Sequence, residues 1–317
     1  MHIVVLGAGG VGGYIGARLI EGGADVSFLV HAKRAAQLAA DGLVVKSPLG
    51  DFARPVRALA SASDIEPAPD AVILACKEPA LAGAMDAVAP LLGKDTRLLP
   101  VLNGVRHMET LAARFAAMPL LGGIAHGAVD LRPDGAIVHL SPFMRVICGP
   151  VAGAGDPVSA GIVGRLQAAG VEAEASPDIL QDMWNKFVFL SAFAGITCLM
   201  RTNIGNILKT DGGRARILQL LEETRAVAEA EGFPPPAALM EEYRALLTQE
   251  GSSFASSMLR DIEAGRRTEG AHILGDMLQR ARRHGLSAPL LAIAAAHVEA
   301  YECQLDERAA ASASAPD

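Results

Sequence analysis

The sequence predicts two domains, an α/β domain with a doubly wound, largely parallel sheet and then an all-α domain. The first half alternates short β-rich runs with helical patterns, which is typical of a sheet covered by helices on both faces. From about Ser176 the strand signals stop, and helical periodicity continues to residue 305. The 317 residues suffice for two domains. We expect domains at 1–177 and 178–307, and a disordered tail at 308–317.

The expected elements of the first half follow one another in strand and helix order. The strands are expected at "HIVVLG", "VSFLV", "LVVK", "AVILAC", "RLLPVLNG" and "LLGGIAHG". Helical patterns between them cover residues 11–21, 33–40, 79–91 and 108–116. The runs "AIVHL" and "RVICG" then predict an antiparallel pair joined across "SPF". In the second half the helices are expected to break at "PPP", "GSS" and "APL", and Ser176 is expected to cap the first of them.

Composition excludes several classes of protein. The net charge of -7 and the absence of a Lys/Arg stripe argue against nucleic-acid binding. We expect no membrane span, because no run of 18 residues lacks charged or strongly polar groups, and we expect no export signal at the start. The four cysteines form no CxxC pair, so neither a metal site nor a dithiol is expected. These features predict a cytoplasmic protein, in which the apolar helices serve as core or as a homodimer interface.

The first strand runs into a glycine-rich turn that opens a helix. Gly7, Gly9 and Gly12 have GxGxxG spacing, with Gly10 and Val11 between them. In such loops the first glycine permits the tight turn, the second allows a pyrophosphate to approach, and the third lets helix and strand pack closely. The helix N-terminus adds N–H groups and a positive dipole end. This context predicts a Rossmann-type dinucleotide site.

The end of the second strand bears on the choice of dinucleotide. NAD-binding folds place an acid there for the ribose 2′-hydroxyl, whereas this sequence has "FLVHAKRAAQ", with His31, Lys33 and Arg34 and no acid. The missing acid favours NADP. The alternative interpretation is that the two bases only begin a solvated helix.

Polar residues end two later strands. Lys77 follows "AVILAC", and Asn103 lies in "LLPVLNG". Each alone is most simply a solvated strand end or an ordinary turn. Because ligands of open α/β sheets bind outside the carboxyl ends of the strands, both together favour donors that face a substrate.

The helical half contains an apolar segment, "MWNKFVFLSAFAG", with Lys186 near its middle. Helical spacing places Lys186, Leu190 and Ala194 on one stripe. Burying an unpaired amine costs several kcal/mol, so Lys186 either extends past Trp184 and Phe187 to water or has a chemical function.

A partner for this lysine is expected in "SSMLRDIEAGRRTEGAHI". Ser257 and Glu269 flank a short charged helix there. The alternatives are that Ser257 is an N-cap and that Glu269 complements a helix dipole.

In this order, "GAGGVG", "CKEPAL", "LNGV", "WNKF" and "SSMLRDIEAGRRTE" resemble the ketopantoate reductase (2-dehydropantoate 2-reductase) family, whose helical half is 6-phosphogluconate dehydrogenase-like. The resemblance implies reduction of a 2-oxo acid with NADPH in a cleft between the domains, in pantothenate biosynthesis. It also implies that Lys186 protonates the carbonyl oxygen and that Glu269 holds this lysine or the new hydroxyl. Ser257 and Asn103 resemble substrate-binding donors, and Lys77 resembles a lysine near nicotinamide and substrate.

The resemblance gives the apolar surroundings of Lys186 a purpose. Partial desolvation by neighbouring aromatic rings is expected to lower the lysine pKa, while a carboxylate keeps it from falling too far. The ammonium would also offset the charge of the developing alkoxide.

The chain departs from the family pattern at three positions. Family members that reduce ketopantoate carry asparagines where this sequence has Leu190 and Ala194, and often arginine in place of His31. Ketopantoate is the leading substrate, and a less polar 2-oxo acid is the alternative. Two other classes stay open: a related dehydrogenase for hydroxy acids, sugar phosphates or imino acids, and a non-catalytic NADP-binding sensor.

Overall fold

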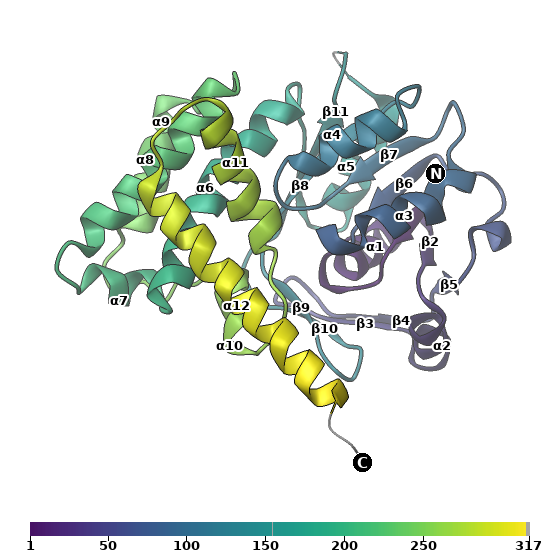
Figure 1. Ribbon diagram of the computed structural model, residues 1–317. Helices are drawn as coiled ribbons and strands as arrows, with labels where there is room; N and C mark the ends of the chain where they lie inside the picture. Colours follow the sequence, from purple (N-terminus) through teal and green to yellow (C-terminus); the bar gives the residue numbers. More distant parts are fainter. Residues whose placement is uncertain (154, 315–317) are drawn as a thin grey trace. The chain divides into compact units, whose positions relative to one another are not determined.

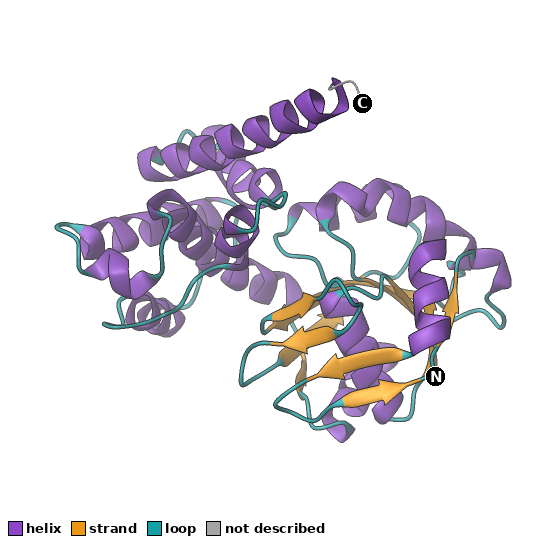
Figure 2. Cartoon of the chain, turned by 90° about the horizontal axis from the view of Figure 1, so that it is seen from below, coloured by secondary structure: helices purple, strands orange, loops and turns teal. Residues whose placement is uncertain are grey.

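The structure is a computed structural model that describes residues 1–153 and 155–314. The chain forms two compact units, Met1–Met183 and a second that begins at Trp184. The first is an α/β unit and the second is helical throughout the described residues (Figure 2), which confirms the predicted fold class. The units divide inside a helix, some residues after the boundary expected at 177/178.

A five-stranded parallel sheet organises the N-terminal unit (Figure 1). Its strand order is β5 (Arg57–Leu59), β2 (Asp25–Leu29), β1 (His2–Leu6), β6 (Ala71–Leu74) and β7 (Arg97–Pro100). Successive side chains of β1 point to opposite faces, so Ile3 and Val5 enter one core cluster while Val4 enters another. A strand buried on both faces needs the continuous apolar run that β1 provides.

Helices cover both faces of this sheet. They are α1 (Gly10–Glu21), α2 (Ala32–Asp41), α3 (Leu81–Val88), α4 (Arg106–Arg114) and α5 (Pro157–Ala168), with 3-10 turns at Ala62–Asp64, Glu78–Ala80 and Ala89–Leu91. Residues of α1 and α5 pack in the cluster of Ile3, and residues of α3 pack in the cluster of Val4. The sheet is therefore doubly wound, as predicted.

Two smaller sheets complete the unit. One has the order β4 (Phe52–Arg54), β3 (Leu43–Lys46), β10 (Ile137–His139) and β9 (Val129–Leu131). The other has the order β12 (Glu172–Ala175), β11 (Arg145–Pro150) and β8 (Leu121–His126). Helix α1 contacts β3, β9 and β10, so the first of these sheets lies against the helix that follows the glycine loop.

The prediction that "AIVHL" and "RVICG" form an antiparallel pair is wrong. β10 pairs with β9 and β3, whereas β11 pairs with β8 and β12. The turn "RPDG" explains the error, since Pro, Asp and Gly favour a tight turn. The Arg132 N–H donates to the Ala136 carbonyl (2.8 Å) and Gly135 has a φ of +88°, which closes a β9–β10 hairpin.

The strand "LVVK" also differs from expectation. β3 lies outside the parallel sheet and pairs with β4 through a short turn, in which Asp51 accepts the Ser47 N–H (2.9 Å). A local hairpin orders fewer residues than a crossover connection. The edge of the parallel sheet is taken by the short strand β5.

The helices of the second unit follow one another with short connections. They are α6 (Ile179–Met200), α7 (Ile204–Leu208), α8 (Gly213–Ala230), α9 (Ala237–Leu247), α10 (Ser257–Glu263), a π-helical turn (Ala271–Gly275), α11 (Asp276–Arg283) and α12 (Pro289–Ser314). Helix α6 begins two residues later than predicted. Asp178, not Ser176, accepts the Gln181 N–H at its start (3.3 Å).

The end of the chain differs from the disordered tail expected at 308–317. Helix α12 continues to Ser314, and residues 315–317 lie outside the described part. Alanine has the highest helix propensity, and adding turns to an existing helix costs less than nucleating one. An alanine-rich end can therefore continue a helix anchored earlier in the chain.

Helix α6 is, among the described helices, the one whose length and apolar composition match a membrane span. In its most apolar 18-residue window 72% of the residues are buried within the protein. Burial of this kind is also what the core helix of a soluble protein requires.

Candidate active site

The glycine loop joins β1 to α1 at the carboxyl edge of the parallel sheet. Gly7 has a φ of +98°, a conformation that glycine adopts without a steric penalty. A Cβ at Gly12 would lie 2.1 Å from the Gly7 carbonyl oxygen and 2.7 Å from Cβ of Ala75. Gly12 is therefore required for the close packing of helix and strand that the motif predicts.

Gly9 is different, because no described atom lies within 4 Å of a Cβ built there. It is the N-cap of α1, has no side chain to cap the helix, and is followed by a first turn without acidic residues. The backbone at Gly9 thus faces open space at a helix N-terminus, where an anionic group is favoured. At Gly10 the space is narrower, since an added Cβ would lie 3.1 Å from the Val129 carbonyl oxygen of β9.

The three basic residues after β2 differ in their surroundings. His31 and Lys33 are exposed at the start of α2. Arg34 is half-buried and donates to the carbonyls of Ala8 (3.2 Å) and Gly135 (3.1 Å). Its burial lowers the pKa of the guanidinium below the ordinary value. Arg34 therefore ties the glycine loop to the β9–β10 turn, which the sequence did not reveal.

Lys77 and Asn103 follow β6 and β7, two strands that pair in parallel. The carboxyl ends of these strands lie at the same sheet edge as Gly7, because β6 also pairs with β1. Lys77 is exposed and precedes a 3-10 turn, while Asn103 is half-buried and precedes Gly104, whose φ is +77°. The structure thus brings both residues to the edge that carries the glycine loop.

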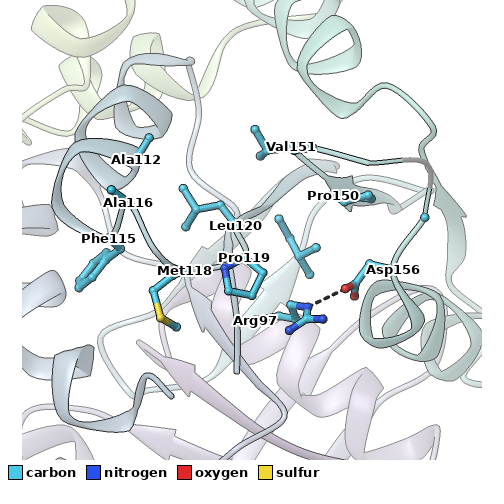
Figure 3. A pocket seen from close by; sticks show the side chains of 13 residues that line it. Arg97, Ala112, Phe115, Ala116, Met118, Pro119, Leu120, Pro150, Val151 and Asp156 are labelled. Atoms are coloured by element: carbon cyan, nitrogen blue, oxygen red, sulfur yellow. Dashed lines mark hydrogen bonds and ion pairs between the residues drawn. The ribbon is translucent and has the colours of Figure 1, made fainter. Parts of the chain in front are cut away.

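A hollow of about 440 Å³ in the N-terminal unit lies elsewhere (Figure 3). It includes Arg97 at the first residue of β7, and the Arg97 guanidinium donates to Asp156 (2.6 Å). None of the predicted site residues lines it. It opens at the amino end of β7, away from the edge that carries the glycine loop.

Lys186 lies in the helical unit, on α6. It is half-buried, between Asn185 and Phe187, which are both buried. Burial lowers the lysine pKa from 10.5 to about 8, and the negative charge of Glu269 opposes this fall. The expected combination of desolvation and a nearby carboxylate is therefore present within one unit.

Glu269 lies in the segment between α10 and the π-helical turn, and this segment is fastened to α12. The Glu302 carboxylate accepts the Thr268 N–H (2.6 Å) and a hydrogen bond from Arg267 (3.1 Å). The Tyr301 hydroxyl donates to the Arg266 carbonyl (2.9 Å). Hydrogen bonds thus hold the residues on the N-terminal side of Glu269. Glu302 was missed because it is one acid among many in the sequence.

Two adjacent serines at the start of α10 have different environments. Ser256 is buried and is the N-cap: its hydroxyl accepts the Leu259 N–H (3.1 Å) and a hydrogen bond from the Thr197 hydroxyl (2.8 Å). Ser257, the predicted substrate donor, is the first helical residue and is exposed. Capping is therefore done by the neighbour of Ser257.

Comparisons with known proteins agree with this architecture. Models of the family Ketopantoate reductase PanE/ApbA and of its C-terminal region match residues 3–153 and 178–302. The uncharacterized oxidoreductase YkpB of Bacillus subtilis (strain 168) is 38% identical over 304 residues, which cover 96% of this chain and 100% of YkpB.

Two solved structures share the fold over 96% of this chain. One is the 2-dehydropantoate 2-reductase of Methylococcus capsulatus (TM-score 0.87, 28% identity, 98% of that chain). The other is a D-mandelate dehydrogenase solved with NADH and anilino(oxo)acetate (TM-score 0.84, 22% identity, 100% of that chain). Both halves of the sequence thus match in order, and the chain belongs to the ketopantoate reductase family of oxidoreductases.

Proposed function

We propose that this protein reduces a 2-oxo acid to a 2-hydroxy acid with NADPH, and that Lys186 is the general acid. The observation that carries the proposal is the half-buried lysine whose pKa falls to about 8 against the opposing charge of Glu269. A general acid works best when its pKa lies near the operating pH, because it must be protonated before the reaction and must give up its proton during it.

The residues of the helical unit would handle the proton and the charge. When bound, the nicotinamide supplies the hydride that reaches C2 of the substrate. The Lys186 ammonium would donate a proton to the carbonyl oxygen and stabilise the negative charge that develops there. Glu269 would keep Lys186 protonated and oriented, and Ser257 and Asn103 would donate hydrogen bonds to the substrate.

The glycine loop fits a dinucleotide. The open space at Gly9 and the uncapped start of α1 suit a pyrophosphate, and the family supports a nicotinamide cofactor. NADP is proposed because no acid follows β2 and because His31 and Lys33 are exposed there. Arg34 would contribute to NADP binding by its positive charge and by its hydrogen bond to the Ala8 carbonyl of the glycine loop. Lys77 would lie near the nicotinamide, at the same sheet edge.

Ketopantoate is the first candidate substrate because the family is named for its reduction. The second candidate is a less polar 2-oxo acid. It is favoured by Leu190 and Ala194 on the stripe of Lys186, since Ala194 is fully buried and neither side chain can pair with a substrate hydroxyl. A buried hydroxyl left without a partner costs roughly 1–3 kcal/mol.

The test is NADPH oxidation at 340 nm by the purified protein with a panel of 2-oxo acids, repeated with NADH and with Lys186→Met. We expect the substitution to reduce turnover by at least about 100-fold, within the range ascribed to general acid catalysis, without weakening NADPH binding measured by fluorescence titration. NADPH binding without reduction of any acid would instead indicate a sensor. Equal loss of binding and turnover in Lys186→Met would refute the role of Lys186.

A further inference from the structure

Four aromatic side chains form a cluster in the helical unit: Phe189, Phe193, Tyr243 and Phe254. The Phe193 and Phe254 rings stack, with centroids 4.1 Å apart and an interplanar angle of 18°. The ring centroid of Phe189 lies 5.6 Å from that of Phe193 and 4.9 Å from that of Tyr243. Two of the rings come from α6, one from α9, and one from the loop between α9 and α10. The cluster therefore joins α6, the helix that carries Lys186, to α9 and to the loop that follows α9.

The cluster lies on the same side of α6 as Lys186. Phe189 and Phe193 follow the lysine by three and seven residues, so at 3.6 residues per turn they deviate from its direction by about 60° and about 20°. Their backbone positions are about 4.5 Å and about 10.5 Å further along the helix axis. Leu190, four residues after the lysine, deviates from its direction by about 40° in the opposite sense. An apolar surface thus extends from the position of Lys186 toward the C-terminal end of α6.

Part of this surface is open. Phe254 is 38% exposed, and Phe189, Leu190 and Tyr243 are half-buried, whereas Phe193 beneath them is 5% exposed. The backbone of Phe254 is fixed, because its carbonyl accepts the Ile204 N–H (3.0 Å) and its N–H donates to the Ser252 hydroxyl (3.2 Å). A large ring is therefore held in place with one part accessible. Apolar surface of this kind next to a reactive group is typical of ligand sites.

The cluster offers ring surface more than hydrogen bonds. The Tyr243 hydroxyl, its polar atom, donates to the Asn185 carbonyl (3.1 Å). The Thr197 hydroxyl, one turn beyond Phe193, donates to the Phe193 carbonyl (2.7 Å) and to Ser256 (2.8 Å). A hydroxylated substrate side chain would find few donors here, whereas a flat apolar ring would find partners with which aromatic groups stack favourably.

We infer that the aromatic cluster is a specificity subsite and that the preferred substrate is a 2-oxo acid with an aromatic side chain. This inference rests on the proposed function, because it needs the carbonyl carbon near Lys186. The aromatic ring of the substrate would lie against Phe254 and Phe189. The reaction itself is the same as for other 2-oxo acids: hydride adds to C2, and the oxygen takes the proton of Lys186.

The experiment compares kcat/KM for 2-oxo-3-phenylpropanoate, 2-oxo-2-phenylacetate, ketopantoate and 2-oxobutanoate, with wild type, Phe254→Ala, Phe254→Leu and Phe143→Ala. Phe143 is a matched control, since it is 54% exposed and lies outside the cluster. We expect wild type to prefer the aryl acids. Phe254→Ala should lower kcat/KM for an aryl acid about tenfold more than for 2-oxobutanoate, which corresponds to the upper range of one aromatic pair. Phe143→Ala should match wild type with every acid.

The outcomes separate the two proposals. Phe254→Leu keeps apolar bulk without a ring, so a selective loss for the aryl acids in this variant supports stacking even if Phe254→Ala fails to fold. Preference of wild type for ketopantoate or 2-oxobutanoate, or equal losses for aryl and small acids in both variants, would overturn the aromatic subsite while leaving the reductase intact. Reduction of none of the four acids would overturn both.

Discussion

The pH dependence of reduction gives the sharpest test of the Lys186–Glu269 pair. The fall of the Lys186 pKa from 10.5 to about 8 corresponds to about 3 kcal/mol, because one pH unit is worth about 1.36 kcal/mol. The ammonium is the acid, so reduction requires the protonated form. We therefore expect kcat/KM for the 2-oxo acid to be constant below pH 8 and to fall as the pH rises through 8. Oxidation of the hydroxy acid needs the neutral amine and should rise over the same range.

Glu269→Gln is the perturbation that isolates the pair. It removes the negative charge that raises the Lys186 pKa and leaves the burial that lowers it. An opposite charge within about 4–6 Å shifts a pKa by about 1–3 pH units, so we expect the alkaline limb of the kcat/KM profile to move about one pH unit or more toward neutral pH. The assay is the 340 nm rate from pH 5.5 to 10, with the cofactor saturating.

The control for this profile is Lys186→Met. It should retain a low rate in which the ionisation near pH 8 is absent. A limb that stays near pH 8 in Glu269→Gln would refute the electrostatic role of Glu269. A limb that persists in Lys186→Met would show that another group is the acid.

Three further predictions test stability, the cofactor loop and the support of Glu269. Because the folded-state pKa of Lys186 is lowered, the folded state gains stability as the pH rises from about 8 to 10.5. The free energy of unfolding of Lys186→Met, measured in urea at pH 7, should exceed that of wild type by up to about 3 kcal/mol. The difference should vanish above pH 10.5. Gly12→Ala should lower the unfolding temperature because its Cβ would lie 2.1 Å from a carbonyl oxygen, whereas Gly9→Ala should fold normally and weaken NADPH binding in a fluorescence titration. Glu302→Ala removes the acceptor of the Thr268 N–H. It should lower kcat about tenfold, which corresponds to about 1.4 kcal/mol, and move the alkaline limb of the kcat/KM profile toward neutral pH. Glu302→Gln should restore both values if the acceptor oxygen of residue 302 matters more than its charge.

Much of the fold was predictable because its signals are local. The run "HIVVL" followed by glycines predicts a buried strand and a tight turn. The structure confirms the strand, since Ile3, Val4 and Val5 are all buried and their side chains alternate between two core clusters. Strand pairing was less predictable. The partners of β10 and β11 depend on a hairpin whose first strand, β9, has three residues and few β-branched side chains. Such a short strand is stabilised by packing on α1 more than by its own propensity.

The candidate site divides in the same way. The glycine turn and the partly buried lysine of α6 could be predicted, because the GxGxxG spacing and a lysine within an apolar segment can both be read directly from the sequence. The tether from Glu302 to Thr268 joins residues 34 positions apart, and the contact of Arg34 with Gly135 joins residues 101 positions apart. No periodicity links residues at such separations. The aromatic cluster was partly visible, since Phe189 and Phe193 are four residues apart, but Phe254 comes from a loop with no periodic signal.

The composition of α6 connects the membrane-like hydropathy of this helix with its chemistry. An 18-residue window of α6 is apolar enough to match a membrane span and is mostly buried. Lys186 lies on this buried helix and is therefore partly desolvated. This desolvation lowers the lysine pKa to about 8. The rings of Phe189 and Phe193 follow the lysine on the same helix. A more polar α6 would raise the pKa of Lys186 toward 10.5 and weaken its acidity. Burial of the helix is therefore a condition for the proposed proton transfer, and the charge of Glu269 sets how far the lysine can be desolvated before it loses its proton.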